Sequence, residues 1–145
     1  MTGFLKKNAW ALSLIVFLIC LMIITKLVQP SFGASGLERV ARAALPFAFA
    51  TAGMAIVVIV GGIDLSVASM MAVCAVTAAV LMEQIASIPA LIIVISLGAI
   101  MGAINGTLIV LTKVPDIVVT LSMLFVWEGA ALLILKSPGG DTADW

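Results

Sequence analysis

The residues best suited to chemistry lie in a short polar break, Gly61-Gly62-Ile63-Asp64-Leu65-Ser66, with apolar segments on both sides. The paired glycines loosen a helical backbone because they carry no side chain. Asp64 can accept hydrogen bonds from the free amides that begin the following helix. The segment therefore predicts an interrupted helix or a tight turn between helices. In a water-filled path, the same break would present Asp64, Ser66 and free backbone groups to a polar solute.

A second acidic residue, Glu128, lies near the middle of another apolar segment. An unpaired charged side chain at the centre of a membrane helix costs about 2.5 to 3.5 kcal/mol even on lenient insertion scales. We therefore expect Glu128 to be protonated, paired or hydrated, which makes it a candidate intramembrane titrating group.

Three glycines, Gly98, Gly102 and Gly106, recur at every fourth residue of one apolar segment. This spacing places them on one helix face, where small residues let a neighbouring helix approach closely, so we expect them to serve helix packing. Asn105 is next to this stripe. It would either hydrogen-bond across the helix interface or face a solute path, and the sequence does not favour one over the other.

Several kinds of chemistry have no residues to support them. Histidine is absent, and the only two cysteines, Cys20 and Cys74, lie inside apolar runs. No His/Cys metal cluster and no histidine-based triad can form, and a buried unpaired cysteine behaves as a small hydrophobic residue. No GxxxxGK[ST] phosphate loop is present. We therefore expect no enzyme activity, no metal site and no cofactor bound by this chain.

The composition predicts a membrane protein. Of the 145 residues, 64% are hydrophobic and 10% are charged, whereas a soluble domain is nearer half apolar and a quarter charged. The seven basic and seven acidic residues cancel, so no overall field favours nucleic acid. The lipid bilayer is the partner that such a surface requires.

The apolar segments predict an all-α, polytopic integral membrane protein with about five transmembrane helices in a single domain over residues 1–145. The first segment is longer than the apolar region of a signal peptide and is expected to stay uncleaved. The spans are expected at about residues 9–27, 43–60, 65–82, 88–112 and 117–135.

The connecting segments are more polar. Residues 29–42 are expected to form a loop with room for a short interfacial helix, and the residues after Lys136 are expected to form a loop outside the membrane. Asp116 is suited to capping the last span. Glu83 is expected in a loop, and Trp127 is expected to pack against apolar or interfacial groups.

Three motifs, in order along the chain, resemble one family. The segment Gly61–Val67 is similar to the GGIDLSVG signature of permeases that import ribose, galactose, xylose, autoinducer-2 and similar sugars. Gly102-Ala103-Ile104-Asn105-Gly106 is similar to the family's G-x-x-N-G segment, and Val114–Leu121 continues the resemblance. The resemblance covers most of the chain after Arg42, and the ordered succession is more specific than any single motif.

The resemblance implies a permease subunit of a bacterial ABC importer for a monosaccharide or related polyol, in the inner membrane. Such a subunit pairs with a second permease, identical or different, and receives its solute from a periplasmic binding protein. Cytoplasmic ATPase subunits drive it and consume the ATP. Family members are longer, so this chain is expected to be the amino-terminal portion of a permease. Many relatives also have a basic residue where this chain has Glu128.

Two other functions stay open. The first is a small proton-coupled secondary transporter in which Glu128 or Asp64 titrates. The second is a truncated membrane fragment that transports nothing.

Overall fold

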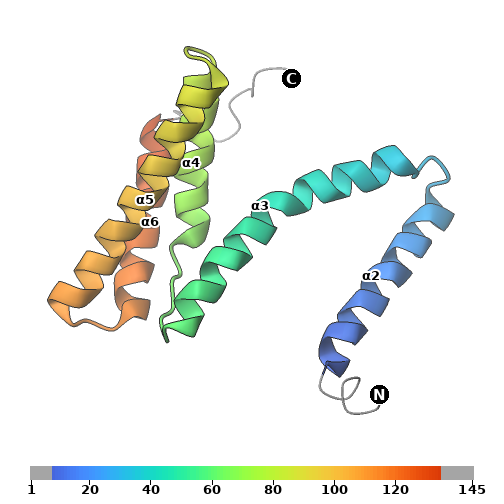
Figure 1. The fold of residues 1–145 in the computed structure, drawn as a ribbon, viewed down its shortest axis with the longest axis horizontal. Coiled ribbons are helices and arrows are strands. Elements are labelled where there is room, and N and C mark those ends of the chain that lie inside the picture. Colours follow the sequence, from blue (N-terminus) through green and yellow to red (C-terminus); the bar gives the residue numbers. More distant parts are fainter. Residues whose placement is uncertain (1–7, 135–145) are drawn as a thin grey trace. The chain divides into compact units, whose positions relative to one another are not determined.

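The computed structural model describes residues 8–134, and this part of the chain is helical without strands (Figure 1). This result confirms the all-α class. The expected loop after Lys136 lies outside the described residues. The helices are, in chain order, α2 (Ala9–Val28), α3 (Ala34–Ile59), α4 (Val67–Met82), α5 (Ser87–Thr112) and α6 (Asp116–Ile134).

Four of these helices, α2, α3, α5 and α6, are long and apolar enough to cross a membrane, which confirms a polytopic membrane protein. The exception is α4, which has 16 residues. At about 1.5 Å per residue it spans roughly 24 Å, less than a hydrocarbon core of about 30 Å. It is short because it starts only at Val67, after the predicted break, which the structure confirms between α3 and α4.

The chain divides into two compact units, residues 1–49 and 50–145. The division falls within α3, three residues after Pro46. Proline has no amide hydrogen and weakens a helix where it occurs in the interior. The expectation of a single transmembrane domain stays a prediction.

In the first unit, the helix α3 begins earlier than the expected span at residue 43. The predicted loop over residues 29–42 is therefore confined to residues 29–33. Glu38 and Arg42, four residues apart, form an ion pair with an N–O distance of 2.7 Å along this added stretch. Pairs at this spacing favour helix, so charge in this stretch extends α3 instead of ending it.

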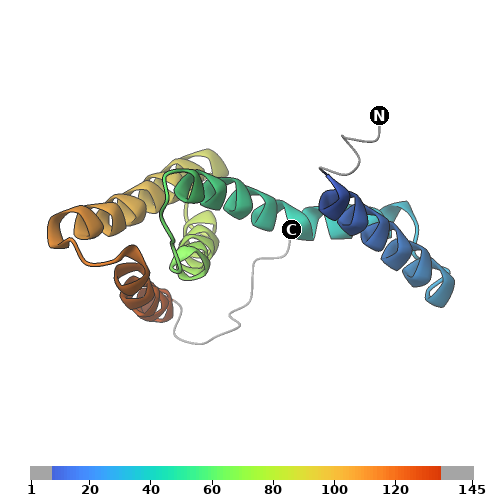
Figure 2. The same cartoon turned by 90° about the horizontal axis from the view of Figure 1, so that it is seen from below.

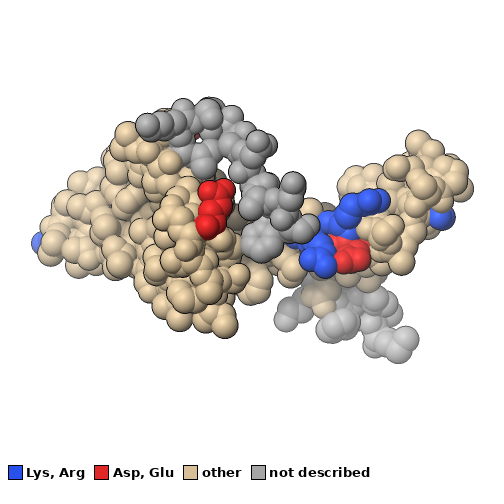
Figure 3. All heavy atoms as spheres, turned by 90° about the horizontal axis from the view of Figure 1, so that it is seen from above, with Lys and Arg blue, Asp and Glu red and all other residues tan. Residues whose placement is uncertain are grey.

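The second unit contains α4, α5 and α6, which lie side by side in Figures 1 and 2. Its small core consists of Val73, Met101 and Ala131, with Trp127 packed against them. Most other large apolar side chains are exposed, for example Leu133 at 84%. On the face drawn in Figure 3, charged side chains are few apart from one cluster that holds both signs. An apolar surface of this extent suits contact with lipid.

The glycine stripe on α5 faces α4 over part of its length. A Cβ atom built on Gly98 would lie 3.6 Å from the Sγ atom of Cys74, and one built on Gly102 would lie 4.0 Å from the Cε atom of Met70. A Cβ atom on Gly106 would have no neighbour within 4 Å. Gly98 and Gly102 therefore face the α4 interface, whereas Gly106 borders open space.

Candidate functional site

The break begins with a tight helix ending at the two glycines. The amides of Gly61 and Gly62 donate to the carbonyl oxygens of Val58 and Val57, at 3.0 and 2.9 Å. Gly61 has a φ angle of +85°, a left-handed conformation that side chains disfavour. A Cβ atom on Gly62 would lie 3.2 Å from the Cγ1 atom of Val57. The first glycine thus permits the turn, and the second permits close packing inside it.

Asp64 organises the start of α4. Its Oδ1 atom accepts hydrogen bonds from the amide of Ser66, at 2.8 Å, and from the hydroxyl of Ser66, at 2.6 Å. An aspartate that binds the backbone two residues later forms an Asx turn. The expected bonds from the first amides of α4 to Asp64 are not formed, and Asp64 instead accepts from Ser66, the residue just before α4. Its Oδ2 atom accepts no hydrogen bond from any residue between 8 and 134.

The first turn of α6 clamps the middle of the break. The Oδ2 atom of Asp116 accepts a hydrogen bond from the amide of Ile63, and the hydroxyl oxygen of Thr120 accepts one from the amide of Leu65, at 3.1 Å. The Thr120 hydroxyl also lies 2.8 Å from the carbonyl oxygen of Asp116, to which it can donate. Residues four apart share one helix face, so this face of α6 supplies partners that a broken helix lacks.

Asn105 joins the break to the centre of the unit. Its Nδ2 atom donates to the hydroxyl oxygen of Ser66 at 2.7 Å, and its Oδ1 atom accepts from the indole nitrogen of Trp127 at 3.3 Å. Asn105 and Ser66 are 3% and 0% exposed. Of the two alternatives for Asn105, the hydrogen bond across the helix interface is therefore present. A continuous chain of hydrogen bonds runs from Trp127 through Asn105 and Ser66 to Asp64; we name these four residues the polar relay.

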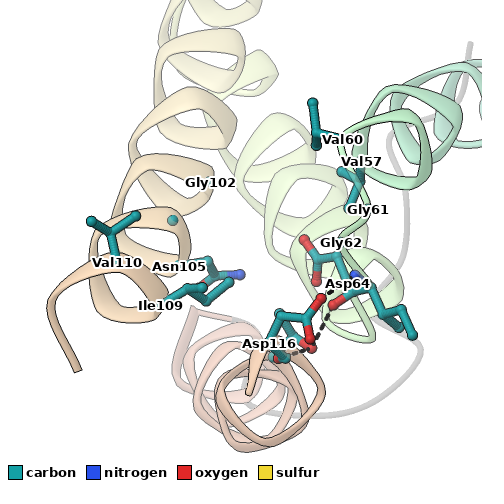
Figure 4. A pocket seen from close by; sticks show the side chains of 13 residues that line it. Val57, Val60, Gly61, Gly62, Asp64, Gly102, Asn105, Ile109, Val110 and Asp116 are labelled. Atoms are coloured by element: carbon teal, nitrogen blue, oxygen red, sulfur yellow. Dashed lines mark hydrogen bonds between the residues drawn. The ribbon is translucent and has the colours of Figure 1, made fainter. Parts of the chain in front are cut away.

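A cavity of about 670 Å³ lies beside the break (Figure 4). Its volume is within the range of small-molecule sites, about 300 to 1,000 Å³. Asn105 also borders this cavity, whereas Ser66 lies beneath the surface. Polar and small residues come from the break, α5 and α6: Gly61, Gly62, Asp64, Gly102, Asn105, Gly106, Asp116 and Thr120. Apolar side chains complete the lining: Val57, Val60, Ile63, Ile109 and Val110.

Three residues of this region were assigned other roles, or none, from the sequence. Asp116 begins α6 as expected, yet its carboxylate also holds the amide of Ile63, 53 residues earlier. Thr120 received no role, although its position four residues after Asp116 on one helix face was a usable signal. Trp127 was expected to pack only, and its indole also donates to Asn105. The common cause is that each partner is distant in sequence.

Glu128 does not line the cavity beside the break. It is exposed on α6 and borders a separate hollow that includes Ala68 and Ala72 of α4. Among residues 8–134 it takes part in no ion pair. The same part of the chain has no group of three or more metal-ligating side chains.

A family model described as "Branched-chain amino acid transport system / permease component" matches residues 36–143. The Autoinducer 2 import system permease protein LsrD of Salmonella paratyphi B is 32% identical over 143 residues, which cover 92% of this chain and 41% of that protein.

The protein of the same name from Escherichia coli O9:H4 is 38% identical over 87 residues, or 59% of this chain and 26% of that protein. The chain thus spans about two fifths, 41%, of the length of the Salmonella relative. No solved structure matches.

Proposed function

We propose, since the chain belongs to the family of branched-chain amino acid transport system permease components, that it forms part of the membrane-spanning permease of a bacterial importer. Membership of this family confirms the resemblance that the three motifs indicated. The chain is accordingly a multi-pass protein of the inner membrane. The proposed solute is a monosaccharide or related polyol such as autoinducer 2, because the similar proteins are named for autoinducer 2 import.

The proposal includes the assembly in which the permease works. A second permease subunit, cytoplasmic ATPase subunits and a periplasmic binding protein would complete the importer. ATP would be consumed by the ATPase subunits, since this chain has no phosphate-binding loop. The residues of the chain would guide the solute without covalent chemistry.

The observation that carries the proposal is the cavity beside the break at residues 61–66. In transporters, interrupted helices that line a cavity place free polar groups in contact with the solute. Here the Oδ2 atom of Asp64 has no hydrogen-bond donor among the described residues, and the cavity includes Asp64. A hydroxyl group of a polyol can donate to this oxygen.

The remaining polar groups favour weak binding. Asn105 already bonds to Ser66 and Trp127, and the carboxylate of Asp116 already accepts the amide of Ile63. A site with few free partners holds a solute loosely. Loose binding suits a permease because conduction requires the solute to leave as well as to enter.

Uptake of labelled solute tests the proposal in cells that express the permease containing this chain together with its ATPase and binding protein. Asp64→Ala is expected to lower uptake by about tenfold or more, the cost of a lost hydrogen bond to a charged group. Asp64→Asn keeps an oxygen for the Ser66 amide and tests the charge. Glu83→Ala, just after α4 ends, is the matched control and is expected to leave uptake nearly unchanged.

Two results would contradict the proposal. Equal uptake by the Asp64 and Glu83 variants, at equal membrane levels, would remove Asp64 from the solute path. Uptake that persists without ATP and stops when the proton gradient is collapsed would replace the ATP-driven importer with the proton-coupled transporter.

A further inference from the structure

Glu128 lies well inside α6, a helix that is long and apolar enough to cross a membrane. It follows Asp116, the first residue of α6, by twelve residues, roughly 18 Å along the axis at about 1.5 Å per residue. Ile134, the last residue of α6, follows it by six residues. Both ends of the helix are thus several ångströms away from this carboxylate. A charged group at such a depth is costly unless it is paired or hydrated.

The surroundings of Glu128 within the chain give it little stabilisation. A hollow of about 260 Å³ lies beside it, lined otherwise by Ala68, Ser69, Ala72 and Leu124. Ser69 is the other polar residue there, and its hydroxyl donates to the carbonyl oxygen of Ser66 at 2.8 Å. Because the single hydroxyl proton is already used, Ser69 has none left to donate to Glu128.

No positive charge of the described part of this unit is placed to pair with Glu128. Residues 50–134 contain four acidic residues and one basic residue, Lys113. Lys113 follows the end of α5 and precedes Asp116 by three residues, so it lies near the opposite end of α6 from Ile134. The one ion pair recorded among residues 8–134 joins Arg42 to Glu38, in the other unit.

The surface around Glu128 has the shape of a helix-docking site. Ala68 and Ala72 are four residues apart on α4, so both lie on one face of that helix. Their small side chains leave the hollow open. In lipid, small residues of this kind let a neighbouring backbone approach closely, and polar side chains then interact across the interface. The surface therefore offers close contact and one carboxyl group without an ion-pair partner among residues 8–134.

We propose that the surface formed by Ala68, Ala72, Leu124 and Glu128, which we name the Glu128 face, binds a membrane-spanning helix that carries a lysine or arginine at the depth of Glu128. The cation would pair with the carboxylate, and the partner helix would fill the hollow. This inference rests on membrane insertion alone and is independent of the solute or of the ATPase.

Reconstitution with designed peptides tests the proposal. The 145-residue chain, carrying a donor dye, is placed in phosphatidylcholine vesicles with an acceptor-labelled Leu/Ala peptide that spans the bilayer. The peptide carries one central Lys, Leu or Glu, and energy transfer reports association. We expect the Lys peptide to associate at least fivefold more tightly than the Leu peptide, and Glu128→Leu to abolish the difference.

Three further variants separate the charge from the surface. Glu128→Lys is expected to favour the Glu peptide over the Lys peptide. Leu124→Trp keeps the charge but fills the hollow, and should weaken association with the Lys peptide. Glu83→Gln, beyond the end of α4, is the matched control and should change nothing.

The proposal is overturned if the native chain does not distinguish the Lys peptide from the Leu peptide. It is also overturned if the preference for Lys survives Glu128→Leu, since the charge would then act from another site. If Glu128→Lys fails to insert, Glu128→Gln serves in its place, and full retention of the Lys preference by Glu128→Gln contradicts the ion pair. A carboxylate that faces a water-filled path instead would give no preference in any of these measurements.

Discussion

At the scale of single residues, the break is held by side chains from distant parts of the chain. Ser66, Thr120 and Asn105 are 0%, 1% and 3% exposed, and each is hydrogen-bonded. A buried polar group left without a partner costs about 1 to 3 kcal/mol. Each of these side chains is therefore needed by its own partner: Ser66 and Asn105 bond to each other, and Thr120 bonds to the Leu65 amide.

Removing Asn105 from the polar relay should destabilise the protein. Asn105→Leu leaves the Ser66 hydroxyl without its donor and the Trp127 indole without its acceptor. We expect a loss of about 1 to 3 kcal/mol in the free energy of unfolding, measured by denaturation in detergent. Ser96→Ala is the control, since that exposed hydroxyl bonds only within its own helix. Equal stability of the two variants would contradict the role of the relay.

The hydrogen bond from the Leu65 amide to Thr120 of α6 gives a separate prediction. Thr120→Val keeps the shape of the side chain but removes the oxygen that accepts the Leu65 amide. Hydrogen exchange at Leu65 should accelerate by about tenfold or more, because local opening exposes an amide that has lost its partner. Ser122→Ala, on the same helix, removes only an exposed hydroxyl bonded to Val118 and should leave this exchange unchanged. Unaltered exchange in Thr120→Val would show that the clamp is not what protects the amide.

The residue scale also shows what the sequence could and could not predict about the site. Gly61 and Asp64 act on neighbours within a few residues, and such local behaviour follows from residue type. Asp116 and Asn105 act on residues 53 and 39 positions away. Those pairings depend on how three helices pack, and no local pattern specifies that packing.

At the scale of elements, the helix ends determine where polar groups become available. The helix α3 ends at Ile59 and α4 begins at Val67. Between them, the amides of Ile63 and Leu65 bond to side chains of α6 instead of to helical carbonyl oxygens. The left-handed glycine at position 61 makes this ending abrupt. Both ends agree with the sequence prediction within a few residues because Gly-Gly and Asp-x-Ser are strong local signals.

The start of α3 was harder to predict. Residues 34–42 include glycine and three charges, which suggested a loop, yet they are helical. The ion pair between Glu38 and Arg42 joins two of these charges across one helical turn. Polarity therefore marked the edge of the apolar span but not the edge of the helix.

Gly61 has a left-handed backbone and Gly53 lies inside a helix, so the same substitution at the two positions tests the turn that begins the break. Gly61→Ala forces a side chain into a left-handed backbone and should cost about 1 to 2 kcal/mol of stability. Gly53→Ala, inside α3 with nothing within 4 Å of the added atom, should instead stabilise by about 0.5 to 1 kcal/mol. Thermal unfolding followed by circular dichroism compares the two. A Gly61→Ala variant as stable as Gly53→Ala would mean that the turn is not held in the described conformation.

At the scale of the whole molecule, composition alone predicts that the protein lies in a membrane. A chain with 64% hydrophobic residues exposes them on most of its described helices, which suits lipid and not water. Family membership then follows from a match that covers residues 36–143. The identity of the solute depends on a few side chains around one cavity, and neither composition nor helix spacing encodes it.

The central claim is that the cavity beside the break is a water-filled path for the solute. Aqueous thiol labelling tests it most directly, in the permease containing this chain, with Cys20 and Cys74 replaced by alanine. Ile109→Cys places a thiol in the cavity lining, and Val126→Cys places one on an exposed face of α6 outside it. We predict that a membrane-impermeant reagent labels Ile109→Cys, that the transported solute slows this labelling, and that Val126→Cys stays unlabelled in lipid. No labelling of Ile109→Cys, or labelling that the solute does not slow, would contradict the account.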